Sequence, residues 1–132
     1  MSDTTPIKTF GPYSPVRRVG DIYFTAGHIG VDPATGEAST DVAMQTRQTL
    51  ENLAATLQSV GLTLDHVVRT TVFLVDMSDF TVVNDTYLQY FKELRPARST
   101  VAVHELPRVA KEGVPLKVEI EAVAGKGATD GS

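Results

Sequence analysis

Cysteine is absent from this chain of 132 residues, and its absence excludes several kinds of protein at once. A disulfide framework, a thiol nucleophile and a zinc–thiolate site all need cysteine. The three histidines, His28, His66 and His104, show no ligand spacing with one another or with carboxylates, so no metal site is expected. Glycine-rich nucleotide motifs, a Walker lysine motif and a Gly-x-Ser-x-Gly elbow are also missing, which leaves these enzyme classes without support.

Long hydrophobic runs and clusters of positive charge are missing as well. No apolar run approaches the roughly eighteen residues of a membrane span, and the first residues, Met-Ser-Asp-Thr-Thr-Pro, contain no apolar signal segment. We therefore expect a cytoplasmic protein that does not enter a membrane. The net charge is −4 and the basic residues are scattered, which argues against nucleic-acid binding.

What is present indicates one globular domain. The length is enough to bury a core, and the apolar fraction (42%) and charged fraction (21%) are ordinary for a soluble protein. We expect a single domain over residues 1–124. The small polar residues 125–132 are expected to be a disordered tail.

The hydrophobic pattern predicts strands, a helix, a strand, a helix and two final strands. The first helix is expected over residues 41–60, with Thr40 or Asp41 as its N-cap and Gly61 as its end. The second is expected from Ser78 to residue 94, because Pro96 forbids continuation. Its apolar stripe comprises Phe80, Val83, Tyr87, Phe91 and Leu94. Strands are expected over residues 21–26, 67–75, 99–103 and 116–124, after a turn-rich loop over residues 10–20 and with a turn over residues 32–36.

A helix between two strands favours a parallel crossover, and one sheet with both helices on one face is the economical architecture. The last two strands are either neighbours or separated by another strand. In the strand over residues 67–75, Val68, Val72 and Leu74 face opposite to Phe73 and Val75. Two helices cannot cover both apolar faces, so we expect an oligomer that buries the remaining one.

Arg98, in Pro96-Ala97-Arg98-Ser99-Thr100, is the first candidate for function. Strand alternation places it on the face of Thr100, Ala102 and His104. A guanidinium there offers two parallel donors to a carboxylate, a geometry that lysine cannot copy. On spacing alone, an ordinary salt bridge at a strand end explains the position as well.

Carboxylates and an amide complete the candidate site. Glu119 and Glu121 share one face of the last strand, where either could orient or deprotonate water, although such alternation is also common on exposed strands. If their strand neighbours that of Arg98, the site could grip a small carboxylic acid and activate water beside it. Asn84 lies in the apolar helical stripe and needs a partner, so it either ties down a loop or touches a ligand. Tyr13 lies in a Gly-Pro-Tyr-Ser loop and could close a pocket.

Many short motifs occur in an order that resembles the Rid (YjgF) family of reactive intermediate deaminases. The resemblance covers residues 7–124. It rests on Gly11-Pro12-Tyr13-Ser14, Ala26-Gly27-His28-Ile29, Asp32-Pro-x-Thr-Gly36, Asn52-Leu53, Gly61, Asp76-Met-Ser-Asp-Phe80, Val83-Asn84, Tyr87, Pro96-Ala97-Arg98-Ser99, Leu106-Pro107 and Val118-Glu119-Ile120-Glu121-Ala122.

This resemblance implies a chorismate-mutase-like α+β domain, a mixed sheet with two helices on one face that assembles as a homotrimeric barrel. The active sites would lie in clefts between subunits. It also implies hydrolysis of 2-imino acids, or of enamine tautomers such as 2-aminoacrylate, to 2-keto acids and ammonia without a cofactor or a metal. A ligand-binding or protein-interaction module and an RNA-cleaving translation inhibitor are alternatives; the acidic charge counts against the latter.

By the same resemblance, Arg98 would clamp the substrate carboxylate and Glu119 would position the attacking water. Tyr13, Asn84 and the backbone at Gly27 would shape the pocket. The chain departs from the family at Ala26 and His28, where active members more often carry serine and glutamine; His28 could replace glutamine as a hydrogen-bond donor or acceptor. The loop over residues 109–114 also looks longer than is typical.

Overall fold

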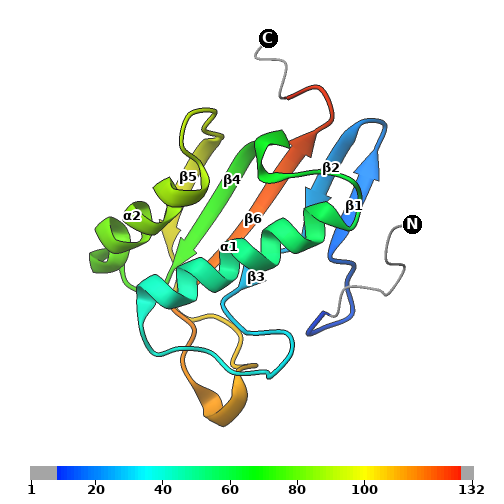
Figure 1. Ribbon diagram of the computed structural model, residues 1–132. Helices are drawn as coiled ribbons and strands as arrows, with labels where there is room; N and C mark the ends of the chain where they lie inside the picture. The colour runs from blue at the N-terminus through cyan, green and yellow to red at the C-terminus, as the bar shows by residue number, and fades with distance from the viewer. Residues whose placement is uncertain (1–8, 129–132) are drawn as a thin grey trace.

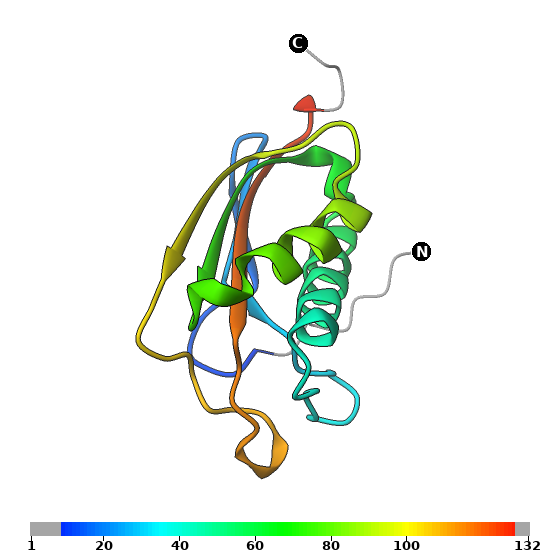
Figure 2. The same ribbon diagram turned by 90° about the vertical axis from the view of Figure 1, so that its left-hand side faces the viewer.

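Both helices lie on one face of a single mixed sheet, and no other element of the described residues covers the opposite face (Figures 1 and 2). The computed structural model describes residues 9–128. The strand order is β1-β2-β6-β4-β5, and β3 also pairs with β6. These strands are β1 (Val16–Val19), β2 (Ile22–Thr25), β3 (His28–Ile29), β4 (Val67–Leu74), β5 (Ala97–Ala102) and β6 (Val118–Gly125). Only the β4–β5 pair is parallel, as expected for strands joined through a helix.

Helix α1 (Val42–Gln58) confirms the prediction from the helical stripe. Asp41 is its N-cap, because its side chain accepts a hydrogen bond from the Met44 backbone N–H at 3.0 Å. The chain leaves the helix at Gly61, whose φ of +81° lies in the left-handed region that favours glycine. Fully buried leucines on one face of α1 join the helix to the sheet; they are Leu50, Leu53 and Leu57.

Helix α2 (Phe80–Tyr90) is shorter than predicted at both ends. Ser78 is not its cap: the Asp76 side chain instead accepts from the Ser78 N–H at 2.9 Å and starts a 3₁₀ turn, Met77–Asp79. At the other end Phe91 has non-helical φ and ψ of −120° and 86°, and its ring is buried against Tyr87. The helix therefore ends at Tyr90, before Arg95 and Pro96 are reached, and Pro96 is not what ends it.

The apolar stripe of α2 is only partly a core stripe. Val83, Tyr87 and Phe91 are buried, as predicted, whereas Phe80 and Leu94 are exposed. Leu94 lies beyond the end of the helix, so it no longer shares the buried face. Phe80 lies in the first turn, beside β5.

The buried face of the sheet follows the alternation of β6. Val118, Ile120 and Ala122 are buried under the helices, while Glu119 and Glu121 point to the other face. On β4 a register shift between Val67 and Arg69 turns Val68 outward, where it is 44% exposed. The prediction that Val68 faces the same way as Val72 is therefore wrong, because a bulge reverses the alternation.

Several strand boundaries also differ from the prediction: β5 and β6 were expected over residues 99–103 and 116–124, and β3 was not expected. Strand β1 falls within the stretch expected to be a loop; it is a short edge strand that turns back onto β2 through Gly20, whose φ is +59°. Gly125 is the last residue of β6 rather than part of a tail. Residues 129–132 of the expected tail lie outside the described part of the chain.

The helix-free face of the sheet carries exposed apolar side chains on strands at both sides. Ile22 and Phe24 of β2 are 42% and 48% exposed, and Val101 of β5 is 42% exposed. The expectation of an apolar face without a cover is confirmed for residues 9–128 (Figure 2). That a second copy covers it stays a prediction.

Candidate functional site

Arg98 is held by two hydrogen bonds on the helix-covered side of β5. Its Nε donates to Thr100 Oγ1 at 2.9 Å, and its Nη2 donates to Asn84 Oδ1 of α2. The bond to Thr100 confirms that these two residues share a face. Asn84 therefore has a definite partner: it ties down the guanidinium rather than a loop, which makes it part of the candidate site.

Two aromatic rings pack against the same guanidinium. The Arg98 Cζ lies 4.8 Å from the centroid of Tyr87 and 5.5 Å from that of Phe80. Such contacts stabilise a cation at an aromatic face. Tyr87 is itself fixed, because its hydroxyl lies 2.7 Å from Thr70 Oγ1. Burial raises the pKa of Tyr87, which keeps the phenol neutral beside the arginine.

The guanidinium still has donors to offer. Of its five N–H groups the two hydrogen bonds use two, and both N–H groups of Nη1 have no partner among the described residues. Within residues 9–128 no carboxylate lies within 4.0 Å of Arg98; the single ion pair found there joins Arg108 to Glu105. An ordinary salt bridge thus does not explain Arg98. It is a positioned cation whose free edge can bind an external carboxylate.

Glu119 lies on the helix-free face of β6, between Ile29 of β3 and Phe73 of β4. Its side chain packs against Gly27, so closely that a Cβ placed on Gly27 would clash with Glu119 Oε2. Burial raises the pKa of Glu119, and the neighbouring Glu121 raises it further. A half-buried carboxylate with a raised pKa is a stronger base than an exposed one, which suits proton transfer with water.

Arg98 and Glu119 do not come together within one copy of the chain. Strand β4 separates their strands, so of the two arrangements that the sequence left open, the last two strands are separated rather than neighbours. Thr70 pairs with Arg98 on one side and with Ala122 on the other, which places Arg98 on the helix-covered face. Glu119, three residues before Ala122, has the opposite orientation.

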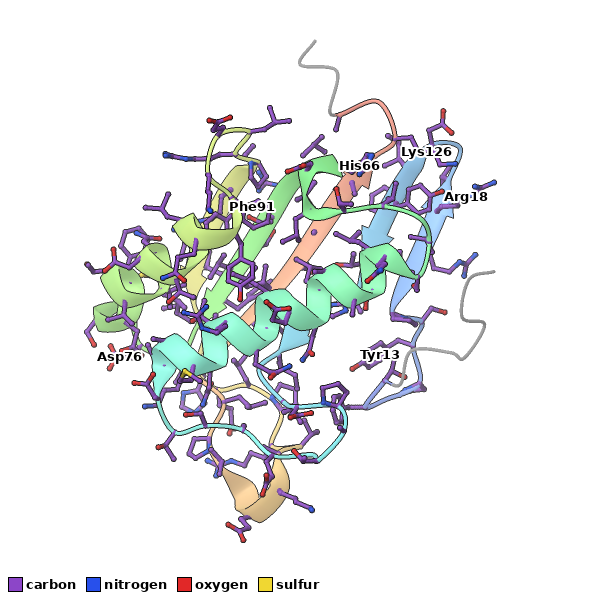
Figure 3. All side chains as sticks on the ribbon, viewed as in Figure 1. Tyr13, Arg18, His66, Asp76, Phe91 and Lys126 are labelled. Atoms are coloured by element: carbon purple, nitrogen blue, oxygen red, sulfur yellow. The ribbon has the colours of Figure 1, made fainter. Side chains whose placement is uncertain are left out.

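A cavity of about 600 Å³ lies beside the other candidates. It lies between the N-terminal loop, the β2–β3 turn, α1 and the loop that contains Lys111; Tyr13, Gly27 and His28 line it. Tyr13 is 49% exposed, consistent with the predicted place at a pocket edge. Figure 3 shows Tyr13 well apart from Phe91 at the end of α2. The candidates thus form two groups, one around Gly27 and one around Arg98.

His28 points to α1. Its Nε2 lies 2.7 Å from Thr56 Oγ1, and its Nδ1 lies 2.8 Å from the Ala26 carbonyl oxygen. Burial lowers the pKa of His28, so the ring is neutral. Both nitrogens already have partners inside the chain, which leaves His28 without a free polar atom for a substrate.

Two residues of these groups were not among the predicted site residues. Phe80 was named only in the apolar stripe and in a family motif, although its ring contacts Arg98. Thr56, 28 residues after His28, was not considered. The available signal was its position: a hydroxyl on the buried face of a helix needs a partner.

Gly27→Ala should separate the role of Glu119 from the fold. The added methyl group would meet Glu119 Oε2, so the carboxylate must move, and we expect turnover to fall by about tenfold or more. Gly125→Ala is the matched control, since its Cβ would lie 3.7 Å from Ile22 Cδ1, an ordinary contact. Thermal unfolding should show both variants folded. Unchanged turnover in folded Gly27→Ala would contradict this placement of Glu119.

The chain is an α+β domain that presents a positioned arginine, with no carboxylate partner within residues 9–128, and a half-buried carboxylate. Comparison with known proteins shows the family to which this domain belongs. The profile of the family described as "Endoribonuclease L-PSP" matches residues 4–126. A 2-iminobutanoate/2-iminopropanoate deaminase of Escherichia coli is 44% identical over 117 residues, 86% of this chain and 87% of the relative. A RutC family protein of Pyrococcus horikoshii is 44% identical over 120 residues, 90% of each chain.

Solved structures agree with the sequence relatives. The YjgF gene product of E. coli superposes with a TM-score of 0.83 at 40% identity, covering 95% of this chain and 96% of that one. E. coli TdcF with bound serine gives a TM-score of 0.83 at 38% identity, covering 92% and 93%. The chain therefore belongs to the YjgF/Rid family and has its fold. Within residues 9–128 no helix is long and apolar enough to cross a membrane.

Proposed function

We propose that this protein hydrolyses reactive 2-imino acids and their enamine tautomers to 2-keto acids and ammonia, without a cofactor. The observation that carries the proposal is the free edge of Arg98, because a substrate of this class carries the carboxylate that such an edge binds. Relatives named 2-iminobutanoate/2-iminopropanoate deaminase support the same reaction. The protein would act in the cytoplasm.

The chemistry requires little beyond orientation. The imine carbon is electrophilic, so one placed water can add to it and form a carbinolamine. Glu119 accepts a proton from that water as the C–O bond forms and returns it to the nitrogen. Glu119 then carries the hydroxyl proton of the carbinolamine to the amine nitrogen, the C–N bond breaks, ammonia leaves, and the carbon–oxygen double bond of the keto acid forms. Arg98 holds the substrate carboxylate throughout.

Two copies of the chain would have to build each site, since Arg98 and Glu119 lie on opposite faces of one sheet. A homotrimeric barrel fits, with the helix-free faces turned inward and the sites in clefts between subunits. The exposed apolar side chains Phe24 and Val101 lie on that face. Tyr13 would close the cleft, and Asn84 would hold Arg98 in place.

Val101→Asp is expected to convert the oligomer to monomers and abolish turnover, because it puts a charge into the apolar face. Met44→Asp is the control: Met44 is 52% exposed but lies on α1, on the other side of the sheet. Sedimentation velocity at micromolar concentration measures the outcome. A native chain that sediments as a monomer would overturn the assembly.

The reaction itself can be tested directly. 2-Iminopropanoate is generated in situ by an amino-acid oxidase, and its loss is followed with and without this protein. Acceleration by the native chain and none by Arg98→Ala is the expected result. No acceleration, or equal acceleration by both, would defeat the proposal. Keto-acid binding without turnover would instead indicate a ligand sensor.

The family description as an endoribonuclease supports a second candidate, RNA cleavage. Phosphate contacts need clustered cations, whereas the 12 basic residues of this chain are scattered and outnumbered by 16 acidic ones. RNA cleavage that survives extensive purification and falls in Arg98→Ala would favour this candidate over deamination.

A further inference from the structure

The turn between β2 and β3 is held from its helix-covered side by two donors. Thr25 Oγ1 donates to the Ala26 carbonyl at 2.9 Å, and His28 Nδ1 lies 2.8 Å from the same oxygen. The Thr25 hydroxyl oxygen in turn accepts the Ala122 backbone N–H at 2.9 Å. The Ala26 carbonyl thus has two partners and a fixed direction.

These contacts determine the tautomer of His28. A carbonyl oxygen only accepts, so Nδ1 must carry the proton. In a neutral ring Nε2 is then an acceptor, and the Thr56 hydroxyl, 2.7 Å away and fully buried, must donate to it. Burial of the ring, which disfavours the charged form, agrees with a neutral imidazole.

The fixed carbonyl also orients the next N–H. In a planar trans peptide the C=O of Ala26 and the N–H of Gly27 point in opposite directions. The Gly27 N–H therefore points away from His28 and Thr25, and it donates to no other residue within 9–128. The carboxylate of Glu119 lies against the same glycine. Two bonds to the carbonyl also polarise the amide and strengthen its N–H as a donor.

We propose that His28, locked by Thr56 as its Nδ1–H tautomer, is a positioning residue that aims the Gly27 N–H at an oxygen of the bound substrate beside Glu119. The inference rests on the proposed deamination. It gives a role to His28, one of the two positions at which the resemblance implies a departure from active members of the family. His28 does not touch the substrate; it acts through the Ala26–Gly27 peptide. Thr56 belongs to the same chain of hydrogen bonds, because its hydroxyl donates to His28.

Nuclear magnetic resonance of the full-length, ¹⁵N-labelled protein tests the tautomer of His28 without any activity measurement. Long-range ¹H–¹⁵N spectra at neutral pH should show a protonated Nδ1 and an unprotonated Nε2 for one histidine, assigned by its loss in His28→Gln. Thr56→Val should shift the Nε2 resonance, because the unprotonated nitrogen loses its donor, while Nδ1 keeps its proton for the Ala26 carbonyl. Thr49→Val should shift neither resonance, because its buried hydroxyl bonds only Gln45 O on the same helix. A protonated Nε2 in the native chain would overturn the inference.

Kinetics of the same variants test the positioning. Gln can donate to Ala26 O and accept from Thr56, so His28→Gln should keep kcat/KM within about threefold. His28→Phe fills the space without a donor, and we expect a fall of about tenfold, mostly in kcat. Combining it with Thr56→Val should cause no further loss, since both act through one chain of bonds. Native turnover in folded His28→Phe would contradict the proposal.

A binding probe separates failure of this inference from failure of the proposed function. Addition of 2-oxobutanoate should shift the Gly27 amide resonance in the native protein and in His28→Gln, and not in His28→Phe. If the native chain deaminates no imine, the proposed function falls, and the tautomer and the Gly27 shift still decide the role of His28. An equal Gly27 shift in His28→Phe would overturn that role.

Discussion

Arg98→Lys is expected to lower kcat/KM for 2-iminopropanoate by about 100-fold or more, although it keeps the positive charge. Lysine cannot donate to Thr100 and Asn84 and still present two parallel N–H groups to a carboxylate. It also loses the flat cation that packs against Tyr87 and Phe80. Geometry rather than charge is therefore what the substitution removes.

A nearby arginine provides the control for Arg98→Lys. Arg95 is exposed, three residues earlier in the chain, and its Nε reaches only the Lys92 carbonyl at 3.4 Å. Arg95→Lys should retain native kinetics, and circular dichroism should show both variants folded. Turnover by folded Arg98→Lys within about threefold of native would refute a bidentate clamp.

Glu119→Gln is expected to lower kcat by about 100-fold and to leave KM nearly unchanged. The amide has almost the same shape as the carboxylate but cannot take a proton from water, whereas substrate binding rests on Arg98. Glu121→Gln is the matched control on the same face of β6. A native kcat in Glu119→Gln, or an equal loss in both variants, would exclude this role.

The pH profile follows from the same residue. Burial and Glu121 raise the pKa of Glu119, and only the ionised form is a base. Turnover should thus fall as the pH drops through this raised pKa, and Glu121→Gln should move that fall in turnover to lower pH.

The stability of the fold should change with pH in the opposite direction. A raised pKa in the folded state favours folding below the unfolded-state pKa, and this contribution is lost as the pH rises through the folded-state pKa. Glu119→Gln should therefore be more resistant to urea at pH 7.

The elements with strong periodicity were predictable from the sequence. Helix α1 carries a leucine stripe, an Asp41 cap and a glycine end, and β6 alternates regularly between apolar and charged residues. The order of strands was not predictable, because the placement of β4 between β5 and β6 is set by packing far along the chain. The bulge at Val68 reverses a local alternation for the same reason, since pairing with β6 decides it.

For the candidate site, sequence reasoning found the ionisable groups but not their partners. Arg98 and Asn84 were both singled out, yet the bond between them depends on how α2 crosses β5. The link from His28 to Thr56 spans 28 residues and follows no periodic pattern. Strand alternation predicted which residues share a face within each strand. Once the strand pairing was known, the same alternation placed Arg98 and Glu119 on opposite faces of the sheet.

In the proposed assembly, Arg98 of one copy and Glu119 of the next complete each site. Arg98→Ala and Glu119→Gln, each inactive alone, are co-expressed with different affinity tags, and trimers that carry both tags are isolated. In a cyclic trimer every such assembly holds one intact site, so mixed trimers should reach about one third of native turnover. Mixed trimers as inactive as their parents would show that both residues act from the same copy and would contradict the account.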